Sequence, residues 1–163
     1  MNSILSREQS NQPSQSGASD RRLRILLLSA SLALFLALML GYVLRVNPPG
    51  SACPDWPTCY GQLAMPEQTA ARLEMAHRVF SGLAALLVAA ATGDALARRG
   101  IPGWVKLALA GSSLLMAAQV LVGRVLVFLD GMSWLGAAHQ GLALLAMALV
   151  SLTAVSAYSN YED

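Results

Sequence analysis

The chain has 163 residues, of which 55% are hydrophobic and only 12% are charged, and its formal net charge is +2. Soluble domains carry about 25% charged residues, so this composition excludes an ordinary soluble domain; together with a mean hydropathy of +0.51 it is typical of a membrane protein. The basic residues are scattered or flank apolar runs, so membrane lipid is an expected partner and nucleic acid is not.

The chain begins with a polar segment, residues 1–20, which is rich in Ser, Gln and Asn. This segment lacks an apolar period, so a disordered tail is expected. It is followed by "RRLR" and by the run Ile25–Leu44, which contains no charged residue. About 20 apolar residues span a bilayer as a helix, so the first membrane span is predicted here. A cleaved signal peptide is disfavoured, because the run is long and no small-x-small site follows it closely.

A polar loop, "VNPPGSACPDWPTCYGQLAMPEQT", covers residues 46–69. Its prolines and glycines exclude a long helix. Cys53 and Cys59, the only cysteines in the chain, lie in this loop and bracket "PDWPT". They are expected to form either a structural disulfide or a redox-active pair, and their spacing does not separate the two.

Three further helices are predicted after the loop, over residues 70–97, 104–129 and 132–158. The first of these is rich in small residues, which allow neighbouring helices to approach closely. The turn "ARRGIPG" and the glycine at position 131 provide the connections. The sequence therefore predicts an all-α, four-helix transmembrane bundle over residues 21–160.

The distribution of basic residues predicts the orientation of the spans, because cytoplasmic segments are enriched in Lys and Arg. A chain with an even number of spans has both termini on the same side of the membrane. That side is predicted to carry most of the basic residues. These are Arg7, Arg21, Arg22 and Arg24 before the first span, and Arg98, Arg99 and Lys106 between the second and third. Both termini are expected in the cytoplasm and the cysteine loop outside. Because no transit peptide is evident, a prokaryotic plasma membrane is expected.

The two histidines of the chain, His77 and His139, are predicted to lie at one depth in different helices. Each is about seven residues, or roughly 10 Å, below the outer end of its helix. This placement suits two axial ligands on opposite faces of one haem iron. The alternative is a hydrogen bond from each histidine to a neighbouring helix, which is also the role expected of Gln119 and Gln140. A zinc site is disfavoured because more ligands should converge.

Charged residues near this level extend the candidate site. Glu74 precedes His77 by three residues, so the two share a helix face and Glu74 is a candidate proton acceptor. The alternative is an ion pair between Glu74 and Arg78 or Arg72 at a solvated helix end. Arg78 and Arg124 are candidates for binding haem propionates; for Arg124 the alternative is snorkelling to the interface.

The segments "CPDWPTCYG", "EMAHR" and "QVLVGRVLVFLDGMSWLGAAHQGLAL" resemble the first half of heme A synthases, over roughly residues 41–150. The resemblance implies oxidation of a haem O ring methyl to a formyl group, with oxygen from water, to supply terminal oxidases. It implies that His77 and His139 are the haem ligands, Glu74 the functional glutamate, and Cys53 and Cys59 the loop cysteines. Haem O is then the substrate, haem b is a further candidate cofactor, and haem O synthase and terminal oxidase assembly are the implied partners.

The sequence departs from this family in two ways. Typical members have eight helices in two related halves, whereas one half is predicted here, and Arg124 stands where a small residue is more usual. A homo-oligomer, most simply a homodimer, would restore two haem sites, with a contact face built from Gly82, Gly93, Ala84 and Ala85. Two alternatives remain: a b-type cytochrome that carries electrons, and a non-enzymatic haem-handling or oxidase-assembly protein. The presence of Glu74 favours the enzyme.

Overall fold

The structure, a computed structural model, describes residues 15–46, 52–129 and 133–159. Each of the helices in these residues is long and apolar enough to cross a membrane, as expected of a multi-pass membrane protein. The predicted all-α, four-helix bundle is therefore confirmed, and the three later helices agree with their predicted bounds to within one residue. The helices are α2 (Gln15–Val46), α3 (Thr69–Ala97), α4 (Gly103–Phe128) and α5 (Ser133–Ser159).

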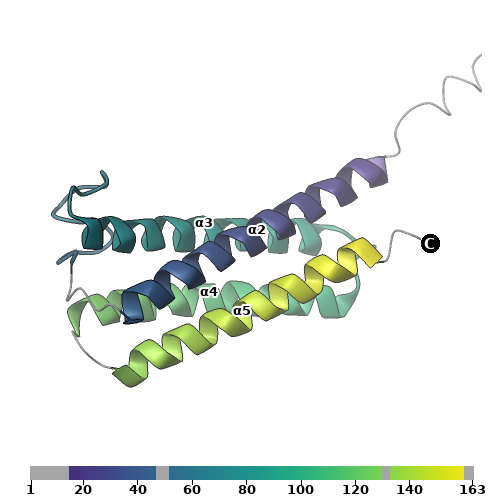
Figure 1. Cartoon of the computed structure of the whole chain (residues 1–163). Helices are drawn as coiled ribbons and strands as arrows, with labels where there is room; N and C mark the ends of the chain where they lie inside the picture. The colour runs from purple at the N-terminus through teal and green to yellow at the C-terminus, as the bar shows by residue number, and fades with distance from the viewer. Residues whose placement is uncertain (1–14, 47–51, 130–132, 160–163) are drawn as a thin grey trace, which may run out of the picture.

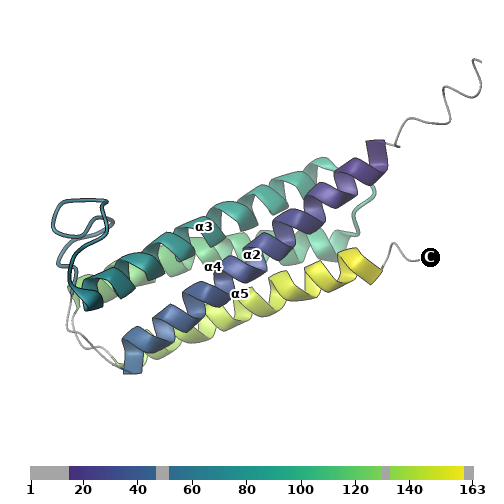
Figure 2. The ribbon, with the colours of Figure 1, turned by 45° about the horizontal axis from the view of Figure 1, so that its top comes forward.

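Consecutive helices run antiparallel and form a ring (Figures 1 and 2). Helix α2 packs against α3 and α5, and α4 packs against the same two helices from the other side. The start of α2 and the end of α5 lie at one end of the bundle, and the cysteine loop lies at the other (Figure 1). The two histidine-bearing helices, α3 and α5, therefore occupy diagonal corners.

The centre of the bundle is filled largely by small and branched side chains, whereas large apolar side chains cover the outside. Leu86, Leu107 and Leu114 are each more than 70% exposed. A soluble bundle would bury such residues, so this outer surface is suited to lipid. Small buried residues let the helix backbones approach closely, and they include Ala30, Ala84, Ala91, Ala95 and Ala146.

The first helix begins earlier than the sequence predicted. Residues 1–20 were expected to be disordered, but α2 starts at Gln15, so the end of that range is helical; residues 1–14 lie outside the described residues. Asp20 forms an ion pair with Arg98, which lies directly after α3. The ion pair with this distant residue stabilises a polar segment that has too few apolar side chains to fold by burying them.

The charges expected on one side of the membrane gather at the end that holds the start of α2. Asp94, near the end of α3, forms ion pairs of 3.5 Å with both Arg22 and Arg98. Lys106 of α4 donates to the Arg98 carbonyl at 2.6 Å. Asp94 therefore lies in the last turn of α3, among the cations at this end of the bundle.

Candidate functional site

His77 of α3 and His139 of α5 face each other across the interior of the bundle. Their ring centroids are 6.5 Å apart and the ring planes are inclined by 67°. Because the two helices are diagonal, only the complete four-helix ring brings the imidazoles together. The two rings lie at one level, as their equal predicted depths indicated.

The hydrogen bond of His77 fixes its tautomer. Its Nδ1 lies 2.9 Å from the carbonyl oxygen of Ala37 on α2. A carbonyl oxygen only accepts, so Nδ1 carries the proton and Nε2 keeps its lone pair. Metal-binding histidines are commonly oriented in this way, through a backbone carbonyl that accepts from the other ring nitrogen.

His139 lies in a less satisfied environment. Its Nδ1 is buried and has no hydrogen-bond partner among the described residues. Gln119 of α4 donates its side-chain N–H to the His139 carbonyl at 2.7 Å, whereas the Gln119 Oε1 is buried without a partner. Gln119 thus has the helix–helix role that the sequence predicted. Unsatisfied buried polar atoms cost free energy, so a polar ligand here would be stabilising.

Glycines of the two neighbouring helices face the imidazoles. A Cβ at Gly41 of α2 would lie 3.0 Å from Cε1 of His77, which is closer than ordinary packing allows. A Cβ at Gly123 of α4 would lie 3.4 Å from Cε1 of His139. All four helices therefore contribute a residue to the layer of the bundle that contains the two imidazoles. The sequence reasoning missed both glycines, although their position inside a span near the histidine depth was a usable signal.

The spacing of the two rings would allow both imidazoles to bind one iron. Two metal–nitrogen bonds of about 2 Å, with about 1 Å from each nitrogen to its ring centre, separate two ring centres by about 6 Å. The observed separation is 6.5 Å. Within the described residues no group of three or more His, Cys, Asp or Glu is gathered. Haem ligation by this pair remains a prediction.

The cysteine loop contains a disulfide. Cys53 and Cys59 are joined with an S–S distance of 2.02 Å. Both half-cystines are buried and pack against Ala71 and Met75 on the first turns of α3. The disulfide therefore anchors the loop to α3, which is the structural role considered above; a redox role remains a prediction.

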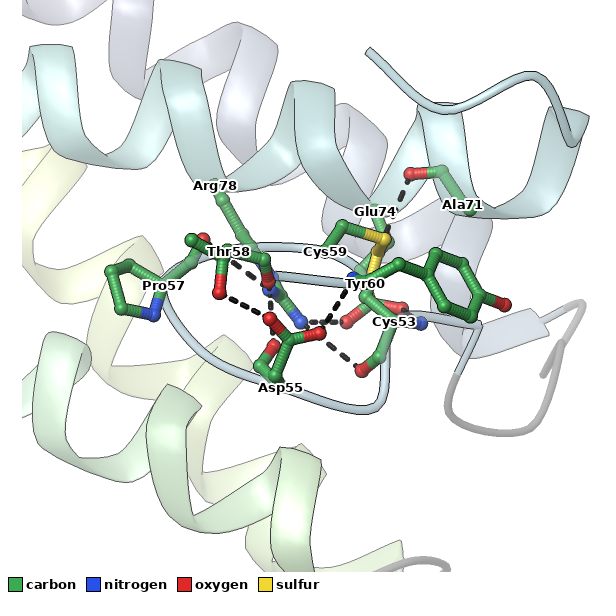
Figure 3. Close-up of polar contacts among 9 residues, drawn as sticks. All are labelled: Cys53, Asp55, Pro57, Thr58, Cys59, Tyr60, Ala71, Glu74 and Arg78. Carbon is green, nitrogen blue, oxygen red and sulfur yellow. Dashed lines mark hydrogen bonds and ion pairs between the residues drawn. A yellow bond between two sulfur atoms is a disulfide. The ribbon is translucent and has the colours of Figure 1, made fainter. Parts of the chain in front are cut away.

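Glu74 joins α3 to this loop (Figure 3). Its Oε2 accepts the backbone N–H of Cys53 at 3.1 Å, and its Oε1 forms an ion pair with Arg78 one turn later. The Glu74 and Arg78 side chains are only 14% and 10% exposed. The ion pair considered as an alternative is therefore present, and it involves Arg78; Arg72 instead donates to the Pro66 carbonyl. The proton-acceptor role of Glu74 remains a prediction.

Arg78 satisfies several backbone carbonyls of the loop (Figure 3). Its guanidinium donates to the carbonyls of Asp55 at 2.7 Å and of Thr58, with longer contacts of 3.4 Å to Pro57 and 3.5 Å to Cys53. The planar fork of arginine suits this task, because a loop without a ladder leaves its carbonyls unpaired. The Arg78 side chain is thus directed at the loop, and propionate binding by it remains a prediction.

A turn around Asp55 closes the loop. The Asp55 carboxylate accepts the Thr58 hydroxyl, the Tyr60 N–H at 2.7 Å and the Gly61 N–H at 2.9 Å. These hydrogen bonds, the Thr58 hydroxyl first among them, hold the pKa of Asp55 below its usual range. Tyr60 and Gly61 adopt positive φ values of 53° and 74°, so the turn needs these backbone contacts. The sequence reasoning did not identify Asp55.

Two further arginines lie at the loop end of the bundle. Arg124 is exposed on α4, and its guanidinium carbon lies 6.0 Å from the Trp56 ring centre. Arg45, at the end of α2, donates to the Ser133 carbonyl at 3.3 Å and passes close to Gly136, where a Cβ would collide with its Nη1. Arg124 therefore reaches the loop from α4, and its proposed contact with a propionate remains a prediction.

Comparisons of the whole chain with protein-family models, characterised proteins and solved structures find no match. The resemblance to heme A synthases therefore rests on the quoted segments.

Proposed function

We propose that this protein is a membrane haem protein with heme A synthase-like activity, which oxidises a ring methyl of haem O to a formyl group with oxygen from water, releasing four protons and passing four electrons to an external electron acceptor. One observation carries the haem part of the proposal. His77 and His139 face each other at 6.5 Å across the bundle, each opposite a glycine of a neighbouring helix. The reaction itself is supported by the resemblance of "CPDWPTCYG" and "EMAHR" to that family.

The roles of the residues follow from their contacts. His77 offers Nε2 as a ligand, because Ala37 holds the proton on Nδ1. Gln119 fixes the backbone at His139 and so helps to set the position of the second imidazole. The bound haem would supply a redox-active macrocycle whose ring methyl is the group to be oxidised. Glu74, one turn before His77, is the proposed acceptor for a proton released in that reaction.

Replacing each histidine with alanine tests the haem site. Each variant and the parent protein are purified separately, and their helical content and disulfide formation are verified. The absorption spectrum of the variant is then compared with that of the parent. A bis-imidazole low-spin spectrum should be lost in both variants. An unaltered spectrum in either His77→Ala or His139→Ala would refute ligation by the pair.

Glu74 allows a sharper test, because a proton acceptor and a loop anchor respond differently to one substitution. Glu74→Gln keeps an oxygen that can accept the Cys53 N–H, but it cannot take up a proton at neutral pH. If Glu74 is the acceptor, this variant binds haem and keeps a protected disulfide but forms no haem A. Full haem A formation in Glu74→Gln would assign Glu74 to the loop alone.

An electron-carrying b-type cytochrome is the second candidate, and one observation favours it. Both oxygens of Glu74 are engaged by Arg78 and Cys53, as a residue with a purely structural role would be. The chain would be expressed together with a haem O synthase, and the extracted haems would be separated chromatographically. Haem A supports the enzyme, whereas haem b alone supports the carrier.

The remaining parts of the proposal concern orientation and assembly. The loop is proposed to face outward from a prokaryotic plasma membrane with both termini in the cytoplasm, which agrees with a disulfide at the loop end.

A homodimer would bring two imidazole pairs together. Gly82 and Gly93 of α3 have open space where a Cβ would lie, so they are available for such a contact. Ala84 is fully buried in the core, so its expected place in the contact face is wrong.

A further inference from the structure

A cavity of about 370 Å³ is lined by residues of α2 and α5. Its α5 residues are the last of that helix, which ends at the opposite end of the bundle from the cysteine loop (Figure 1). Its walls are mostly apolar, with two hydroxyl-bearing residues where α5 ends. It opens outward, since Leu28 is 48% and Val155 66% exposed. The lining residues are Leu28, Ala154, Val155, Tyr158 and Ser159.

Basic residues continue this cavity along α2 toward the helix end. Arg21, Arg24 and Leu28 are spaced at i, i+3 and i+7, so they follow one face of the helix. The Arg24 guanidinium lies 4.9 Å above the Tyr158 ring and donates to the Ala157 carbonyl at 3.0 Å. Arg21 is exposed one turn further out. Arg24 therefore lies beside the cavity, and Arg21 lies one turn closer to the start of α2 on the same helix face.

The charge at this end favours an anionic occupant. Among the described residues at this end, the acidic ones are Asp20 and Asp94, and both are paired with arginines. The described cations at this end are more numerous: Arg21, Arg22, Arg24, Arg98, Arg99 and Lys106. Basic pockets between membrane helices attract anionic headgroups, at about 1 kcal/mol per basic residue.

We infer that this cavity is a binding site for an anionic phospholipid. An acyl chain would lie against Leu28, Ala154 and Val155, with the headgroup phosphate beside Arg21 and Arg24. The inference does not depend on the proposed haem chemistry, because it concerns the opposite end of the bundle and other residues.

The test uses the purified full chain in a neutral detergent, titrated with phosphatidylglycerol, phosphatidylcholine or inorganic phosphate. Native mass spectrometry counts the bound molecules. One phosphatidylglycerol should be retained selectively, and inorganic phosphate should neither bind nor compete at equal concentration. Equal retention of phosphatidylcholine, or saturation by inorganic phosphate alone, would overturn the proposal.

Substitutions locate the site. Arg21→Gln should weaken phosphatidylglycerol binding about fivefold, the equivalent of about 1 kcal/mol per basic residue. Val155→Trp should abolish binding by filling the cavity, and its exposure makes the larger side chain tolerable for folding. The matched control is Arg99→Gln, which removes an exposed charge from the α3–α4 connection. If Arg99→Gln weakened binding as much as Arg21→Gln, the attraction would be a diffuse field, and the site would be refuted.

Discussion

Glu74 and Cys53 are 21 residues apart in the chain, yet the carboxylate of one accepts the backbone N–H of the other at 3.1 Å. Arg78 holds the same carboxylate from the next turn of α3. The first turns of α3 and the cysteine loop therefore form one structural unit, which begins one helical turn before His77.

Removing this carboxylate should expose the disulfide. Glu74→Ala leaves the Cys53 N–H and the Arg78 guanidinium without their acceptor, and hydrogen bonds to charged groups contribute about 1.5–3 kcal/mol. The loop should open at least roughly tenfold more often. The rate of disulfide reduction by a small thiol, followed by labelling of the released cysteines, measures this opening.

Glu67→Ala is the matched control, because Glu67 is exposed in the same loop and carries the same charge. Its reduction rate should equal that of the parent protein. An equal rate in Glu74→Ala as well would show that the carboxylate does not hold the loop.

The disulfide itself should stabilise the fold. The two cysteines are six positions apart, and closing so short a loop is expected to contribute about 2 kcal/mol. Replacing both Cys53 and Cys59 with serine should lower the thermal midpoint while leaving the helical content unchanged. A midpoint equal to that of the parent would mean that Arg78 and Glu74 alone fix the loop.

The glycines facing the imidazoles should respond to alanine in a defined order. Alanine at Gly41 would crowd His77, and alanine at Gly123 would only touch His139, whereas Gly111 of α4 faces open space. Gly111→Ala should stabilise α4 by about 0.5–1 kcal/mol. Gly41→Ala should destabilise the bundle and reduce haem content, and Gly123→Ala should fall between them. Thermal unfolding measures the stability of each variant, and haem absorption measures its haem content. A Gly123→Ala variant that is less stable than Gly41→Ala would contradict the described imidazole positions.

The turn around Asp55 should depend on pH in one direction. The folded pKa of Asp55 lies below its usual value, so the hydrogen-bonded carboxylate favours the folded loop. Its contribution is complete above the unfolded pKa of about 4 and is lost as the pH falls through the lower folded value. Trp56 fluorescence should therefore stay constant at neutral pH and change only in acid.

This measurement requires a parent in which Trp104 and Trp134 are replaced with phenylalanine. Asp55→Asn in that background should show no such acid transition. A transition that persists in Asp55→Asn would belong to another group.

Periodicity and length were enough to predict the helices, because each span needs about 20 apolar residues whatever its neighbours are. Equal depth was enough to predict that His77 and His139 meet, since a membrane helix advances by a fixed rise per residue. These two arguments use only local geometry and the thickness of the bilayer.

Other features depend on contacts that sequence spacing does not define. The partner of Glu74 is set by the path of the loop, so the spacing to His77 left two roles open. The turn around Asp55 and the crossing of Arg45 past Gly136 arise in the same way. Asp20 was assigned to a disordered tail because its partner, Arg98, is a residue distant in the chain.

The diagonal placement of the two imidazoles has a consequence for biogenesis. His77 is carried by α3, whereas His139 arrives only with α5, the last described helix. A nascent chain that has inserted its earlier spans presents a single imidazole to the membrane interior. An iron porphyrin held by both rings would therefore be captured only after Ser133–Ser159 has docked between α2 and α4, so cofactor acquisition would report that the four described helices have assembled.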